Sequence, residues 1–173
     1  MIALTHLSGL DWAIPRVKPV RLVSLLEPAA MIETPRGIDP AMHLKIEVDD
    51  IAAPQSDYIH PREDHIRRLA EFGARWDGKS TLLVHCAGGR SRSPAALMIF
   101  LVQKNPGGEA AVARMLFERA PHICPNRLMV ELGDRVLGAN GRLVAALDGM
   151  PPPDGTLLDG VRSFPVWVGG RRA

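Results

Sequence analysis

The chain has 173 residues, 46% hydrophobic and 23% charged, a composition typical of a single folded domain and not of a disordered or fibrous protein. The formal net charge of +2, from 21 basic and 19 acidic residues, argues against a general nucleic-acid or membrane-surface binder, because such proteins need a basic surplus. The N-terminus lacks the pattern of a secretory signal, and the longest apolar run (residues 95–102) is too short to span a bilayer. Two cysteines make no disulfide framework. We therefore expect a cytoplasmic protein with reduced thiols and no membrane contact.

Two strand-like segments occupy the first third of the chain. Residues 20–26 are rich in apolar and β-branched side chains, and residues 43–48 alternate between apolar and polar with period two. The intervening residues 27–42 contain three prolines and one glycine, which is typical of a surface loop. Residues 61–76 then predict a helix, because a proline in the first turn followed by two acidic residues suits a helix start.

The second half of the chain is mainly helical in pattern. Residues 81–84, T-L-L-V, form a short continuous apolar run, as expected of a strand buried on both faces of a parallel sheet. Residues 93–104 are apolar nearly all round, which predicts a central buried helix, and two further helices are expected over residues 109–119 and 126–137.

Strands followed by helices in this order predict an α/β fold, with a central, mostly parallel sheet flanked by helices. We expect residues 1–148 to form one domain. Residues 149–173 are rich in glycine and proline and weak in periodicity, so we expect a C-terminal tail of uncertain order rather than a second domain.

The segment with most chemical content, residues 84–94, reads V-H-C-A-G-G-R-S-R-S-P. It joins the buried strand to the central helix, so it lies at the carboxyl end of a sheet strand, where ligands bind in open α/β folds. Gly88 and Gly89 allow the backbone to turn tightly and to bring its N–H groups round to one centre. Converging N–H groups above a helix N-terminus form an anion site that suits phosphate.

Cys86 lies at the start of this loop, and Arg92 follows six positions later. Helix N-termini and nearby cations favour the thiolate form of a cysteine. If the loop curls, the Arg92 guanidinium can bind two oxygens of a phosphate held over the sulfur. This combination suits phosphoryl transfer to Cys86, with a phosphocysteine that water then hydrolyses.

Residues 85–93, H-C-A-G-G-R-S-R-S, resemble the signature of the cysteine-dependent protein tyrosine phosphatases, His-Cys-x-x-Gly-x-x-Arg-Ser/Thr. Chain length and layout resemble the small dual-specificity group. The resemblance covers about residues 20–137 and leaves the expected tail outside it. It implies a phosphatase fold with a phosphate-binding loop between strand and helix, and a substrate that is a phosphorylated protein or a small phosphomonoester.

The resemblance also implies roles for the matched positions. Cys86 is the expected nucleophile and Arg92 the phosphate clamp, while Ser93 hydrogen-bonds the sulfur and helps it leave in the second step. His85 supports the loop and the thiolate, and Asn126, in the segment I-C-P-N, hydrogen-bonds the loop from a later helix. Backbone amides of the following residues are expected to bind the phosphate: Ala87, Gly88, Gly89, Arg90, Ser91 and Arg92.

The general acid has three candidates, Asp49, Asp50 and Asp57. In this family the aspartate lies roughly thirty residues before the cysteine, and this spacing alone slightly favours Asp57. The context H-L-K-I-E-V-D-D-I favours Asp50, because it resembles the family's strand ending in an aspartate followed by a small or β-branched residue. We choose Asp50 as the expected acid.

Other site chemistries fit the same residues less well. His85 and Cys86 with His122 and Cys124 could supply zinc ligands, but adjacent residues of a strand point to opposite faces, so we expect no metal site. The loop lacks the lysine of a nucleotide-binding P-loop. Arg90 either adds positive charge to the rim, favouring substrates such as phosphoinositides or RNA ends, or is a solvent-exposed arginine.

We therefore expect a phosphatase acting on phosphate monoesters without a cofactor, because the loop itself supplies the charge stabilisation. Two alternatives stay open from the sequence. One is a rhodanese-like sulfurtransferase or an arsenate reductase, which also use a cysteine in an anion-binding loop. The other is a phosphate-binding module without turnover.

Overall fold

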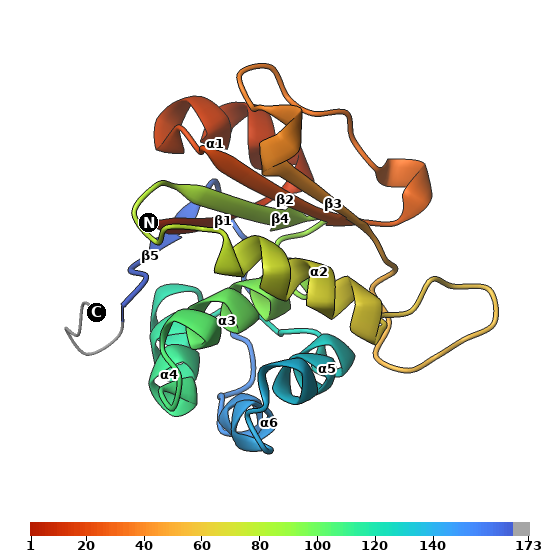
Figure 1. Cartoon of the computed structure of the whole chain (residues 1–173), viewed down its shortest axis with the longest axis vertical. Coiled ribbons are helices and arrows are strands. Elements are labelled where there is room, and N and C mark those ends of the chain that lie inside the picture. Colours follow the sequence, from red (N-terminus) through yellow and green to blue (C-terminus); the bar gives the residue numbers. More distant parts are fainter. Residues whose placement is uncertain (168–173) are drawn as a thin grey trace.

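The computed structural model describes residues 1–167, which fold around one five-stranded sheet with the order β3-β2-β4-β1-β5 (Figure 1). The strands are β1 (Ile2–His6), β2 (Arg21–Leu26), β3 (His43–Glu47), β4 (Leu82–Cys86) and β5 (Arg162–Phe164). The pairings β1–β4, β4–β2 and β2–β3 are parallel, and β5 is antiparallel to β1 at one edge. This confirms the expected α/β fold with a mostly parallel sheet.

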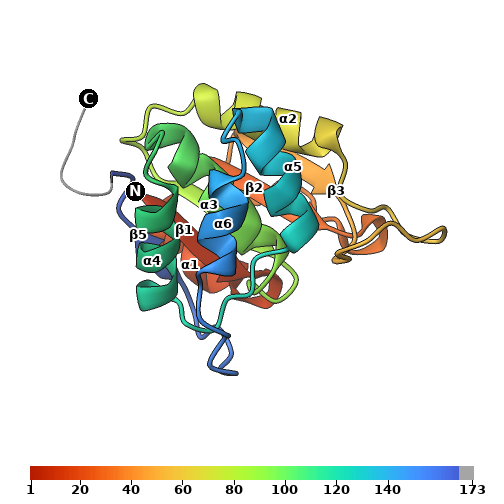
Figure 2. The same ribbon diagram turned by 90° about the horizontal axis from the view of Figure 1, so that it is seen from below.

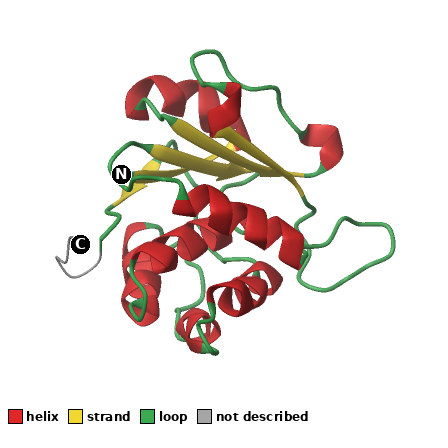
Figure 3. Cartoon of the chain, viewed as in Figure 1, coloured by secondary structure: helices red, strands yellow, loops and turns green. Residues whose placement is uncertain are grey.

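Helices cover both faces of the sheet (Figure 3). Figure 1 shows α1 on one face and the other five helices on the opposite face. Their bounds are α1 (Leu10–Val17), α2 (Glu63–Ala74), α3 (Arg92–Lys104), α4 (Glu109–Arg119), α5 (Arg127–Leu137) and α6 (Arg142–Asp148). Three short 3₁₀ turns lie at Leu7–Gly9, Pro28–Ala30 and Pro40–Met42.

The central strands β1, β2 and β4 are mainly apolar because both faces of the sheet are buried. Leu22 and Leu83 pack in the smaller cluster on the α1 side, whereas Val23 and Val84 belong to the larger cluster under the helical layer. Helix α3 is buried from Arg92 to Val102, since it lies between the sheet and the outer helices. The nearly uniform apolarity of this segment predicted such a central position, and the structure confirms it.

The element bounds differ from expectation mainly at the ends of the chain. The strands and helices expected between residues 20 and 137 are all present, with small shifts of their first and last residues. The sequence did not predict β1, α1, α6 or β5. The last of these lies within the expected tail, whose residues 168–173 fall outside the described part of the chain.

The parallel pairings bring the carboxyl ends of four strands to one edge of the sheet. His6 at the end of β1 and Leu25 near the end of β2 are both register partners of Cys86 at the end of β4. Segments that follow these strands can therefore meet around Cys86. Within residues 1–167, no helix is long and apolar enough to cross a bilayer.

Candidate active site

Residues 87–91 form the loop between β4 and α3, here called the phosphate loop. Three of its carbonyls are paired with neighbouring segments: those of Ala87, Arg90 and Ser91 accept hydrogen bonds from the amides of Leu7 (3.1 Å), Cys124 (2.8 Å) and Asn126 (3.1 Å). Within the described part of the chain, none of the five amides of residues 87–91 donates a hydrogen bond to another residue. These amides are therefore available to an anion above the N-terminus of α3.

The two glycines of the phosphate loop have different roles. Gly89 has a φ of +66°, and a Cβ there would lie 2.6 Å from Leu158 Cδ2 and 3.0 Å from the Thr5 carbonyl oxygen, so only glycine fits. A Cβ on Gly88 would meet nothing within 4 Å. The turn therefore depends on Gly89, which is also the fixed glycine of the signature, whereas Gly88 stands at one of its variable positions.

Cys86 ends β4 and lies at the base of the phosphate loop, with 1% of its surface exposed. The Ser93 hydroxyl, on the first turn of α3, donates a hydrogen bond to Cys86 Sγ over 3.1 Å. The resemblance to the phosphatase signature implied a contact between Ser93 and Cys86, and the structure places the Ser93 hydroxyl and Cys86 Sγ together at the N-terminus of α3.

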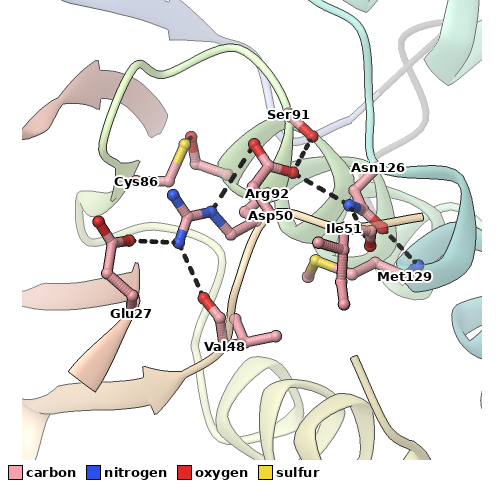
Figure 4. A network of polar contacts seen from close by, with 10 residues as sticks. Glu27, Val48, Asp50, Ile51, Cys86, Ser91, Arg92, Asn126 and Met129 are labelled. Atoms are coloured by element: carbon pink, nitrogen blue, oxygen red, sulfur yellow. Dashed lines mark hydrogen bonds and ion pairs between the residues drawn. The ribbon is translucent and has the colours of Figure 1, made fainter. Parts of the chain in front are cut away.

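The Arg92 guanidinium lies between Glu27, Val48 and Asp50 (Figure 4). One terminal nitrogen, Nη1, donates to the Val48 carbonyl (2.8 Å) and to Glu27 Oε2 (3.0 Å). Its Nε is buried, makes no hydrogen bond to a described residue and faces Asp50 Oδ2 at 3.9 Å. The guanidinium is therefore held from one side and keeps hydrogen-bonding capacity for an oxyanion.

Glu27 is a site residue that the sequence did not predict. It follows β2, the strand next to β4, and its own backbone amide and the Arg92 guanidinium lower its pKa. An acidic residue directly after a buried parallel strand, at the edge where ligands bind, is the signal that could have found it.

Asp50 lies at the rim of the phosphate loop, and both of its carboxylate oxygens face site residues. Oδ1 accepts hydrogen bonds from Ser91 Oγ (2.6 Å) and Asn126 Nδ2 (3.1 Å), while Oδ2 is the oxygen nearest Arg92 Nε (Figure 4). Asn126, the N-cap of α5, also donates to the Ile51 carbonyl (3.0 Å). Asn126 thus connects the Asp50 segment, the phosphate loop and α5.

The other two aspartate candidates lie in different surroundings. Asp49 closes the neck of the 50–58 loop: its amide donates to the Ile59 carbonyl (2.8 Å), and its Oδ2 accepts from the Ile59 amide (2.7 Å). Asp57 is exposed within that loop and accepts a hydrogen bond from Ser56. Of the three, only Asp50 contacts phosphate-loop residues among the hydrogen bonds and ion pairs of the described chain.

A buried chain of polar side chains lies behind Cys86. His85 Nε2 is 2.6 Å from Ser24 Oγ, which is 2.8 Å from His43 Nε2, and His43 Nδ1 is 2.9 Å from Thr34 Oγ1. Burial lowers the pKa of both histidines to about 4, so both rings are neutral near pH 7. The sequence singled out His85 but not its partners, which come from two other strands and a loop.

Arg90 is part of the phosphate loop, and Cys124 borders it through the hydrogen bond from its amide to the Arg90 carbonyl. The Arg90 side chain is half-buried. Burial is the main cause that lowers the pKa of His122, and the positive charge of Arg90 lowers it further. Cys124 is an exposed free thiol. Among residues 1–167, no group of three or more histidine, cysteine or acidic side chains is placed to hold a metal ion.

No family model and no curated protein matches this sequence. Solved structures with a similar fold include DUSP15, with 18% identity and a TM-score of 0.61 over 87% of this chain and 92% of that one. Human DUSP28 has 19% identity and a TM-score of 0.61 over 80% and 92% of the two chains. PTPMT1, in complex with PI(5)P, has 15% identity and a TM-score of 0.60 over 82% and 94%. The chain therefore has the fold of the dual-specificity phosphatases.

Proposed function

We propose that this protein hydrolyses phosphate monoesters through a phosphocysteine intermediate on Cys86. One observation carries the proposal: Cys86 is buried at a helix N-terminus beside loop amides and an Arg92 Nε that make no hydrogen bond to any of residues 1–167. Amides and a guanidinium arranged in this way stabilise the charge of a phosphoryl group in transfer without a metal.

In the first step the Cys86 thiolate attacks phosphorus, and the bond from phosphorus to the leaving oxygen breaks. Arg92 and the phosphate-loop amides bind the non-bridging oxygens. Asp50 supplies the proton to the leaving oxygen. Its Oδ1 already accepts two hydrogen bonds, so Oδ2 is the oxygen that can carry this proton.

In the second step a water molecule attacks the phosphocysteine, and Asp50, now a carboxylate, accepts the proton of that water. The sulfur–phosphorus bond breaks and inorganic phosphate leaves. Sulfur departs as a thiolate, and the Ser93 hydroxyl stabilises it through the hydrogen bond to Sγ.

The substrate class we propose is a phosphorylated protein or a small phosphomonoester. The similar structure of PTPMT1 contains PI(5)P, and Arg90 adds positive charge beside the loop, so a phosphoinositide is a further substrate to test. The chemistry needs no cofactor.

The test is hydrolysis of para-nitrophenyl phosphate without added metal, between about pH 4 and pH 8. A carboxylic acid that acts as proton donor loses its proton within this range. The variants are Cys86→Ser, Asp49→Asn, Asp50→Asn and Asp57→Asn. Cys86→Ser should abolish turnover and keep phosphate binding, because the loop amides and Arg92 are unchanged. Asp50→Asn should lower kcat by about 10²-fold and remove the fall in rate above the optimum, because the proton donor is lost.

Asp57→Asn is the matched control and should stay close to the wild type. Asp49→Asn should also stay close, because its amide oxygen can still accept the hydrogen bond from the Ile59 amide. Full activity of Cys86→Ser would exclude the phosphocysteine mechanism. Thiosulfate-to-cyanide sulfur transfer faster than phosphate release would instead show a sulfurtransferase. Phosphopeptide binding without phosphate release would show a binding module.

A further inference from the structure

Residues 151–161, here called the C-terminal strap, connect α6 in the helical layer to β5 at the edge of the sheet (Figure 2). They lie outside the segment that resembles the phosphatases in sequence. Their central apolar residue, Leu158, is buried, with 8% of its surface exposed. Its neighbour Leu157 is 83% exposed, so the strap inserts one leucine into the protein and leaves the other in solvent.

Leu158 packs directly against the phosphate loop. Its Cδ2 lies 2.6 Å from the position that a Cβ on Gly89 would occupy. On the same side of Gly89, the Thr5 carbonyl oxygen lies 3.0 Å from that position. Gly89 therefore packs with this side against both the strap and the end of β1, and it is the one residue of the loop whose left-handed φ makes the turn.

The strap is fixed to the protein on both sides of Leu158. Before it, the Asp154 amide donates to the Pro121 carbonyl over 3.0 Å. After it, Thr5 Oγ1 donates to the Gly160 carbonyl over 2.8 Å. Thr5 thus contacts the strap with its side chain and Gly89 with its backbone, so Leu158 is held in one position against the loop.

We propose that Leu158 is a positioning residue that holds Gly89, and through it the phosphate-loop amides, in the arrangement that binds an oxyanion over Cys86. The oxyanion is a phosphoryl group if the proposed function is correct. The physical reason is packing: interiors are filled without voids, so removing this side chain gives Gly89 room to move toward the vacated volume. Amides that shift by about 1 Å lose much of their effect on a transition state.

The experiment compares four variants in a Cys124→Ser background, so that Cys86 is the only thiol. Leu158→Ala removes the contact, and Leu158→Ile restores most of its volume. Leu157→Ala is the control for the exposed neighbour. Val166→Ala controls for general loss of stability. It removes a buried side chain that also follows α6, but Val166 lies near Asn105, at the end of α3 opposite the phosphate loop.

Three quantities are measured: the Kd for inorganic phosphate, kcat on para-nitrophenyl phosphate, and the rate of Cys86 alkylation by iodoacetamide at fixed pH. Leu158→Ala should weaken phosphate binding and lower kcat by ~10-fold each and change the alkylation rate, because the loop amides are displaced. Leu158→Ile should recover most of the loss. Leu157→Ala and Val166→Ala should remain near the background protein.

Equal effects of Leu158→Ala and Val166→Ala, or no effect of Leu158→Ala, would overturn the positioning role. If the background protein neither binds nor hydrolyses phosphate, the proposed function fails, and the alkylation rate alone decides this inference. A change confined to Leu158→Ala then still supports the strap contact, and an unchanged rate rejects it.

Discussion

Arg92 uses one terminal nitrogen for protein contacts and leaves Nε without a hydrogen bond within the described chain. A side chain this long loses much conformational freedom when it is fixed, and here the Glu27 carboxylate and the Val48 carbonyl offset that loss before any ligand binds. If the proposed function is correct, Glu27 therefore acts on the phosphoryl group indirectly, by setting the direction of the Arg92 guanidinium.

Glu27→Ala should lower kcat/KM by ~10-fold, because Arg92 loses its charged partner and the clamp is less well oriented. Glu27→Gln keeps an oxygen acceptor and should lose less. Glu33→Ala is the control, since Glu33 is an exposed acid that pairs with Lys45 at the surface. The measurement is steady-state kinetics on para-nitrophenyl phosphate, and equal losses for Glu27→Ala and Glu33→Ala would contradict the orienting role.

The helices and strands that the sequence predicted are the ones whose residues show a strong hydrophobic pattern of their own. Residues 81–84 and 93–104 have continuous apolar runs, and their structures follow from burial. The three residues of β5 have no such pattern, and they are a strand because β1 offers them a free edge. The same division holds within the site: the motif covers the residues that follow Cys86 along the chain, whereas Glu27, His43 and Leu158 reach it from distant segments.

The loop of residues 50–58 begins with Asp50 and is closed by the two hydrogen bonds between Asp49 and Ile59. Asp49→Ala should remove the side-chain bond, which is worth about 1 kcal/mol, and loosen the loop. We expect faster proteolytic cleavage within residues 50–58 and a severalfold lower kcat, because Asp50 is less well held. Asp57→Ala, which lies outside the neck, is the control, and similar cleavage rates in the two variants would argue against this role of Asp49.

The chain of polar side chains crosses the three adjacent strands β3, β2 and β4. It runs from Thr34, in the connection before β3, through His43 and Ser24 to His85. Ser24, His43 and His85 are buried in the mainly apolar sheet, and Thr34 is partly buried at its margin. Such a chain stabilises the fold only while every member has its partner, and a proton added to either ring introduces a buried charge.

This chain should make stability depend on pH. Both histidines have a pKa of about 4 in the folded protein and an ordinary value of 6.5, so the unfolded chain binds more protons between these limits. The free energy of unfolding should therefore fall as the pH drops from about 6.5 to about 4. His43→Gln keeps hydrogen-bonding groups without a titrating ring and should give a shallower fall, measured by urea unfolding at each pH. An unchanged slope would show that His43 does not contribute.

The pairing of β1 with β4 and β5 also has a consequence for protein synthesis. β1 leaves the ribosome before both of its partners, because β4 lies about 80 residues and β5 about 160 residues further along the chain. Contacts between such distant segments form slowly and late. The wall of the phosphate loop that includes Leu158 and Thr5 is thus assembled only after residues 151–161 have been synthesised, and the growing chain has no complete site before they emerge.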